Sequence, residues 1–89
     1  MSIFIYILRL KSGNIYIGST TNLENRYAEH IKGTASRMTK LDPPVRIAYT
    51  ETYETQLEAR QREAQIKRWS RAKKEALISK NMSKLKSLK

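Results

Sequence analysis

Residues 4–30 constrain the fold more than any other part of the chain, because they contain two β-type runs joined by a short turn. Residues 3–10, IFIYILRL, are rich in isoleucine with Phe and Tyr, which favours a strand. Residues 15–19, IYIGS, resume this pattern after the sequence KSGN at residues 11–14, whose Gly and Asn suit a tight reversal. The stretch therefore predicts a β-hairpin.

The alternation of side chains along a strand distributes the hairpin over two faces. Tyr6 takes one face of the first run, while the isoleucines on either side of it take the other. In the second run Tyr16 shares a face with Gly18. Both tyrosines can therefore lie on one face, opposite the isoleucines, and Gly18 permits close approach of a ligand or another backbone segment.

A helix is predicted directly after the hairpin, over residues 22–32. Thr21 and Glu24 have the spacing of a capping box, and Gly33 suits the helix end. The helical spacing predicts an inward stripe with Arg26 at its edge, four residues before His30. The members of that stripe are Leu23, Tyr27, His30 and Ile31.

The remaining pattern completes one small domain. Residues 33–44 are polar and rich in turn formers, residues 45–51 alternate as a third strand, and a second capping box at residues 55–58 opens a helix to about Trp69. A further helix is expected over about 71–79. The order ββαβαα predicts an α+β fold, a small three-stranded antiparallel sheet flanked by helices. We expect one domain over residues 1–80 and a flexible basic tail over 81–89.

The positive charge is concentrated in the last third of the chain. Residues 1–59 have a net charge of +1 and residues 60–89 have +9. Such a basic segment indicates a polyanionic partner, with nucleic acid favoured over a merely soluble surface or an anionic membrane, since no sustained apolar helix face is evident. The candidate nucleic-acid-binding residues lie in this basic segment and in the predicted loop at residues 33–44. They are Arg37, Lys40, Lys67, Arg68, Arg71, Lys73 and Lys74.

Several protein classes are excluded or disfavoured. The chain has no cysteine, which excludes a disulfide framework and cysteine-based metal or nucleophilic chemistry. The apolar N-terminus is too short for a membrane span and lacks the features of a signal peptide. A cytoplasmic location without membrane association is the expectation; the sequence does not identify a protein partner.

Glu63 is the carboxylate in the predicted second helix that could have a chemical function. It lies at the margin of the inward face, flanked by Arg60 and Lys67. One interpretation is an ordinary ion pair with one of these bases. The other is a ligand for one divalent ion, because Mg²⁺ is often held by only one or two carboxylates together with substrate phosphate oxygens.

The candidate side chains of residues 4–30 also have two interpretations, one structural and one catalytic. A single helical histidine such as His30 is more often structural than catalytic, and Arg26 alone is more often a solvated base. Tyr6 and Tyr16 alone are more often sheet aromatics. By residue type and spacing alone, these side chains indicate a basic α+β domain with a polar cluster.

The ordered combination of these residues resembles the GIY-YIG nuclease superfamily. The matching segments are Ile5-Tyr6-Ile7, Ile15-Tyr16-Ile17-Gly18 and the run from Leu23 to His30. The later helix with Glu63, followed by SRAKKEALI, resembles the small stand-alone bacterial members. The resemblance covers roughly residues 2–78.

The resemblance implies a catalytic role for five residues. Tyr6 would act as general base or position the attacking water, Tyr16 is the second-motif tyrosine, and His30 would accept or relay the proton from Tyr6. Arg26 would stabilise charge on the scissile phosphate, and Glu63 would hold one Mg²⁺ or Mn²⁺ ion. This set suits phosphodiester hydrolysis, since a phenol with an ordinary pKa near 10 needs assistance near neutral pH.

The implied function is a metal-dependent endonuclease acting on DNA, structure- or damage-directed in repair or recombination. Among the departures from the family pattern, the most serious one lies downstream of Glu63. Many members have an asparagine about a dozen residues after the metal-binding glutamate, where this chain has Glu75. The alternative is therefore a nucleic-acid-binding module that retains the fold and cuts little or nothing, and an RNA-associated role also stays open.

Overall fold

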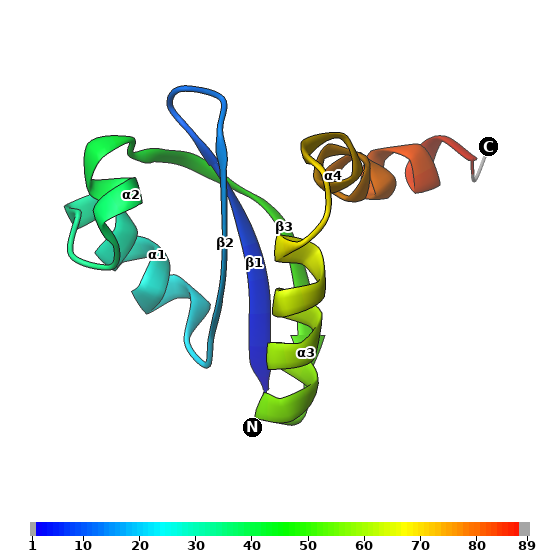
Figure 1. Ribbon diagram of the computed structural model, residues 1–89, viewed down its shortest axis with the longest axis horizontal. Coiled ribbons are helices and arrows are strands. Elements are labelled where there is room, and N and C mark those ends of the chain that lie inside the picture. Colours follow the sequence, from blue (N-terminus) through cyan, green and yellow to red (C-terminus); the bar gives the residue numbers. More distant parts are fainter. Residues whose placement is uncertain (1, 88–89) are drawn as a thin grey trace.

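The computed structural model describes the backbone of residues 2–87 and the side chains of residues 2–80. Its centre is a three-stranded antiparallel sheet in the order β2-β1-β3 (Figure 1). The strands are β1 (Ile3–Leu10), β2 (Ile15–Thr20) and β3 (Pro44–Tyr53). The hairpin of β1 and β2 is therefore confirmed, and the first strand of the chain is the central one.

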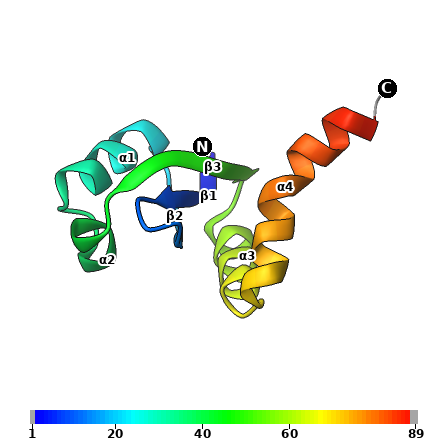
Figure 2. The ribbon, with the colours of Figure 1, turned by 90° about the horizontal axis from the view of Figure 1, so that it is seen from above.

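The helices lie in two layers, one on each face of the sheet. Helices α1 (Leu23–Lys32) and α2 (Arg37–Leu41) cover one face, and α3 (Gln56–Lys67) and α4 (Arg71–Ser87) lie on the other side (Figures 1 and 2). The predicted α+β class and the order ββαβαα are confirmed. The short helix α2 is an addition, within a segment that the sequence predicted as a loop.

The two faces of β1 have different cores. Its isoleucines at odd positions pack with Ile17 against α3 and α4, through Ala59, Ile66 and Leu77. Its even positions, Tyr6, Leu8 and Leu10, are buried against Tyr16 and α1. Burial of one isoleucine contributes about 1.5–3 kcal/mol, so the purely apolar face provides much of the stability.

Two details of α1 correct the sequence-based prediction. Its N-cap is Asn22, whose side chain accepts a hydrogen bond from the Asn25 amide; the predicted cap at Thr21 is wrong. Ile31, predicted to point inward, is 57% exposed, because α1 turns His30 rather than Ile31 toward the sheet. Gly33 ends the helix with φ of 83°, as predicted.

The segment before β3 contains α2 because Ser36 caps it, accepting a hydrogen bond from the Thr39 amide. At the other end of the chain, α4 runs past its predicted end near residue 79. The side chains of the predicted tail 81–89 lie outside the described residues, and its flexibility stays a prediction. Over the part of the chain that the structure describes, no helix has the length and apolar character needed to cross a bilayer.

Candidate active site

The hairpin brings Tyr6 and Tyr16 together on the face covered by α1. In the strand register Tyr6 is opposite Gly18 and Leu8 is opposite Tyr16, and the two phenol rings have centroids 6.3 Å apart. The Tyr6 ring crosses above Gly18, where an added Cβ would lie 2.5 Å from the Tyr6 hydroxyl oxygen. Gly18 is therefore required for Tyr6 to extend its hydroxyl toward the edge of β2.

Helix α1 places His30 directly against both tyrosines. The Tyr6 hydroxyl forms a hydrogen bond of 2.8 Å with His30 Nε2, and neither residue has more than 1% of its surface exposed. The His30 ring also packs edge-on against Tyr16, with centroids 4.8 Å apart. These three side chains therefore lie together on one face of the sheet.

A second partner of His30 was not predicted. Its Nδ1 lies 2.7 Å from the Thr39 hydroxyl of α2, and Thr39 is buried. That hydroxyl in turn lies 2.9 Å from the Ser36 hydroxyl. The capping spacing of Ser36 and Thr39 was a signal for α2, but no local pattern indicates that Thr39 reaches His30. The result is a continuous hydrogen-bond chain from Tyr6 to Ser36.

Arg26, one turn before His30 on α1, approaches the Tyr6 hydroxyl. Its Nε donates to Glu29, 3.0 Å away, and its side chain is 41% exposed. Burial is the main cause that raises the pKa of Tyr6 to about 12, and the neighbouring Tyr16 raises it further. Arg26 acts in the opposite direction and lowers this pKa. Burial, together with the Arg26 charge, lowers the pKa of His30, so the imidazole is neutral near pH 7.

Glu63 comes from the opposite helix layer and faces the edge of β2. Thr55 caps α3, as predicted, and Glu63 lies two turns into this helix. Its carboxylate pairs with the Lys67 ammonium at 2.7 Å, and it lines a cavity shared with Ser19 of β2. Its negative charge also acts to raise the pKa of Tyr6. Glu63 therefore forms an ion pair with Lys67, one of the two bases predicted for it, and its charge also acts on the Tyr6 hydroxyl.

The donor set limits the kind of metal ion that could bind. Within the described residues, no group of three or more His, Asp or Glu side chains could hold a metal. Glu63 is a single carboxylate that opens into a cavity of about 340 Å³. This fits an ion that takes one carboxylate together with water and substrate phosphate oxygens, such as Mg²⁺, once Lys67 has released the carboxylate.

Glu75, at the position where the resemblance implies an asparagine, takes part in intramolecular ion pairs. Its two carboxylate oxygens accept hydrogen bonds of 2.6 and 2.7 Å from Arg9 of β1, and Arg71 donates a further one of 3.0 Å. Arg71 also donates to the carbonyl of Gly13 in the hairpin turn. The hydrogen bonds from Arg9 lower the pKa of Glu75 to about 2. This cluster fastens α4 to the hairpin.

The basic residues predicted to bind nucleic acid form two groups. Arg37 and Lys40 are exposed on α2, and the others lie on the α3–α4 side of the molecule (Figure 2). Several of the second group already have intramolecular contacts: Lys73, for example, lies 4.4 Å from the centroid of the Trp69 ring. The structure therefore does not gather these residues into one patch.

Comparison with known proteins establishes the family. Residues 2–76 match the model of the GIY-YIG catalytic domain. This chain belongs to the GIY-YIG family. The GIY-YIG family is of the nuclease type, which implies nucleic-acid binding.

Individual relatives agree with this assignment. A UPF0213 protein of Staphylococcus saprophyticus is 41% identical over 76 residues, covering 85% of this chain and 93% of the relative. A UPF0213 protein of Natronomonas pharaonis is also 41% identical over 76 residues, covering 85% and 89%. The solution NMR structure of a UPF0213 protein from Bacillus halodurans superposes with a TM-score of 0.59 at 35% identity, covering 89% of this chain and 84% of that one. These similarities span nearly the whole domain.

Proposed function

We propose that this GIY-YIG protein is a divalent-metal-dependent endonuclease that hydrolyses DNA phosphodiesters, directed by structure or damage rather than by a defined sequence. The observation that supports this most directly is the buried hydrogen bond between the Tyr6 hydroxyl and His30 Nε2. It couples a phenol at the edge of β2 to a neutral imidazole that can take up a proton. The five residues implied by the family resemblance, Tyr6, Tyr16, Arg26, His30 and Glu63, lie around that bond and the adjoining β2 edge.

The shifts in pKa favour a concerted proton transfer. Burial raises the pKa of Tyr6 to about 12 and lowers the pKa of His30. Both shifts disfavour a free tyrosinate beside a protonated imidazole. In the proposed step Tyr6 takes a proton from the attacking water while it gives its own to His30, so no free tyrosinate forms.

The hydrogen-bond chain behind His30 supports this direction of transfer. His30 Nε2 can accept from Tyr6 only if the ring proton is on Nδ1, which then donates to the Thr39 hydroxyl. Thr39 can in turn donate to the hydroxyl or the carbonyl oxygen of Ser36. Thr39 is therefore proposed as the residue that holds the imidazole in the required tautomer.

The remaining residues act on the phosphate. As water adds to phosphorus, the bond to the leaving oxygen breaks and that oxygen takes a proton from solvent. Arg26, with its partly exposed guanidinium, would stabilise the charge that develops on the phosphate oxygens. A divalent ion held by Glu63 would supply Lewis-acid stabilisation of the leaving oxygen.

A binding module without cleavage is the second candidate function. Two observations favour it: Lys67 competes with a metal ion for the Glu63 carboxylate, and Glu75 is engaged by Arg9 at the position where the resemblance implies an asparagine. Purified protein incubated with branched, nicked, single-stranded and supercoiled DNA in Mg²⁺ or Mn²⁺ separates the two. We expect cleavage by wild type and a loss of about 10²-fold or more in Tyr6→Phe and Glu63→Gln.

A matched control is Glu54→Gln, which removes an exposed carboxylate in the segment before α3 and should cleave as wild type does. Wild-type protein that binds these DNAs but cuts none of them would favour the binding module. Cleavage that persists in Glu63→Gln would refute the metal role of this carboxylate.

A further inference from the structure

Two adjoining cavities run along the free edge of β2. The first, of about 260 Å³, extends from α1 to α3, and the second, of about 340 Å³, contains Glu63. Ser19 and Arg60 line both cavities, which therefore adjoin, and the two together are called the β2-edge groove. Only the second contains the proposed metal ligand, Glu63, whereas the first is lined by Arg26 and Arg60.

One stripe of α3 forms the wall of this groove. Gln56, Arg60, Glu63 and Lys67 are spaced by four, three and four residues, which places them on one side of a helix. From Gln56 to Lys67 the stripe is about 16 Å long at 1.5 Å per residue. A strand of a duplex rises about 3.4 Å per nucleotide along the helix axis, so this length is enough for at least two consecutive phosphates.

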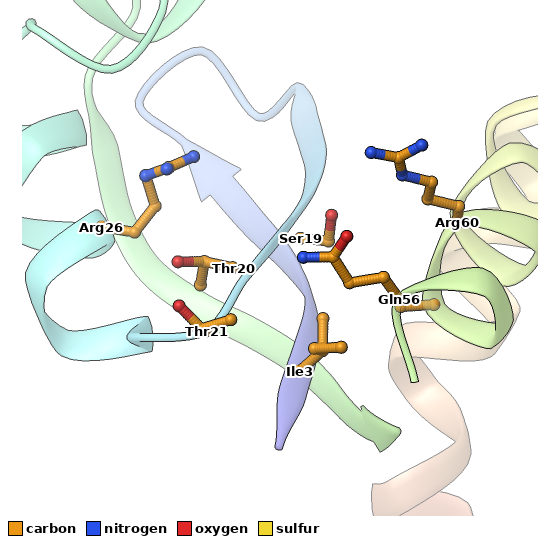
Figure 3. A pocket seen from close by; sticks show the side chains of 8 residues that line it. Ile3, Ser19, Thr20, Thr21, Arg26, Gln56 and Arg60 are labelled. Atoms are coloured by element: carbon orange, nitrogen blue, oxygen red, sulfur yellow. The ribbon is translucent and has the colours of Figure 1, made fainter. Parts of the chain in front are cut away.

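The chemistry of the first cavity matches an oxyanion. Arg26 of α1 and Arg60 of α3 enter it from opposite sides, with Ser19, Thr21 and Gln56 between them (Figure 3). No carboxylate lines this cavity, and within residues 2–80 no carboxylate lies within 4.0 Å of the Arg60 guanidinium. Two guanidinium groups with hydroxyl and amide donors between them are suited to the several oxygens of a phosphate.

We propose that this first cavity binds the phosphate next to the scissile one in a nucleic-acid strand, with Arg60 as its principal ligand. The neighbouring Glu63 cavity then receives the scissile phosphate, since Ser19 and Arg60 border both. Arg26 lines the first cavity and also acts on the Tyr6 hydroxyl, so it would contact the bound strand from the α1 side. The assignment of the scissile position rests on the proposed function; the binding of a strand phosphate at Arg60 does not.

Binding measurements without divalent ions test the proposal separately from cleavage. We would titrate a fluorescein-labelled single strand and a nicked duplex with protein in EDTA, at salt concentrations from about 50 to 200 mM. Arg60→Gln should weaken binding about tenfold and reduce the slope of log affinity against log salt by about 1. Arg60 is exposed, so this variant should fold, which thermal unfolding would verify.

Arg46→Gln provides the matched control. Arg46 is an exposed arginine on β3, the opposite edge of the sheet, so the variant loses the same charge at a distant place. An equal loss of affinity in both variants would overturn the proposal, because it would show a general charge effect. Inorganic phosphate that competes as well as the oligonucleotide at equal ionic strength would also overturn it, by assigning the cavity to a free anion.

The two proposals fail in different ways. If Arg60→Gln weakens binding as expected while wild type cuts no DNA, the phosphate site stands and the endonuclease proposal fails. If wild type cuts DNA and Arg60→Gln binds and cuts equally well, the phosphate site fails and the endonuclease proposal stands.

Discussion

The central strand β1 contributes side chains to both faces of the sheet, and the two faces differ in what they bury. On the face of α3 and α4, β1 contributes isoleucines to an apolar core. On the face of α1 it contributes Tyr6, which is buried together with the polar side chains of His30 and Thr39. Buried polar groups cost free energy unless they are hydrogen-bonded, and here each has a partner. The odd positions of β1 therefore face a purely apolar core, and the even positions combine the apolar Leu8 and Leu10 with the hydrogen-bonded Tyr6.

The largest effect on stability should come from the apolar face. Ile7→Ala removes a fully buried side chain and should lower the free energy of unfolding by about 2–5 kcal/mol. Ile31→Ala, the same change at a 57% exposed position on the other face, should stay within about 0.5 kcal/mol of wild type. Urea unfolding would measure both, and equal effects would contradict the contribution of buried Ile7 to stability.

On the polar face, Thr39→Val tests whether the hydrogen-bond chain matters as proposed. The change keeps the shape of the side chain but removes the partner of His30 Nδ1, which should cost about 1–3 kcal/mol. The chain has a single histidine, so ¹⁵N NMR reports its tautomer without ambiguity. We expect an Nδ1–H imidazole in wild type and in Thr39→Ser, and loss of that tautomer in Thr39→Val.

Thr52→Val supplies the control for Thr39→Val, because Thr52 is exposed on β3. It should leave both the stability and the histidine spectrum unchanged. An unchanged His30 tautomer in Thr39→Val would refute the positioning role of Thr39, whatever happens to stability.

The smallest effect concerns Glu75, at the end of the apolar face. Its folded-state pKa of about 2 is below the ordinary value of 4.5, so its contribution is present above pH 4.5 and is lost as the pH falls toward 2. Glu75→Gln should cost about 1 kcal/mol at neutral pH, since the pair is partly exposed, and should weaken the acid dependence of unfolding in that window.

Some acid dependence should persist in Glu75→Gln because of a second carboxylate. Burial opposes ionisation of Glu51, but Arg62 and two tyrosine hydroxyls lower its pKa to about 2. Glu54→Gln, which changes an exposed glutamate, serves as the comparison. A full acid dependence retained in Glu75→Gln would show that the Arg9 contact does not stabilise the fold.

Local patterns predicted the strands and the two faces well. Alternation over β1 and β2 was enough to place Tyr6 and Tyr16 together, because a strand has only two sides. Helical spacing likewise placed Arg26 and His30 one turn apart. It could not fix the rotation of α1, and Ile31 was assigned to the wrong side as a result.

Contacts between distant residues were not accessible from the sequence. Thr39 lies in a polar segment that resembled a loop, and its contact with His30 depends on how α2 folds back on α1. Glu75 meets Arg9 across a separation of 66 residues, so nothing near Glu75 indicated that it would serve as a clamp. These contacts depend on tertiary packing, which local propensity does not encode.

The central position of β1 affects the order in which the protein can be completed during synthesis. β1 emerges first, but Ile3 pairs with Tyr53 of β3, and α3 with Glu63 follows later still. Until β3 has been made, one edge of β1 remains unpaired, and until α3 and α4 follow, its isoleucine face remains uncovered. Both states are open to association with other chains. A nascent chain that ends before α3 has Tyr6, Tyr16, Arg26 and His30 but neither Arg60 nor Glu63. Under the proposed mechanism, it therefore cannot cleave nucleic acid before its own fold has closed.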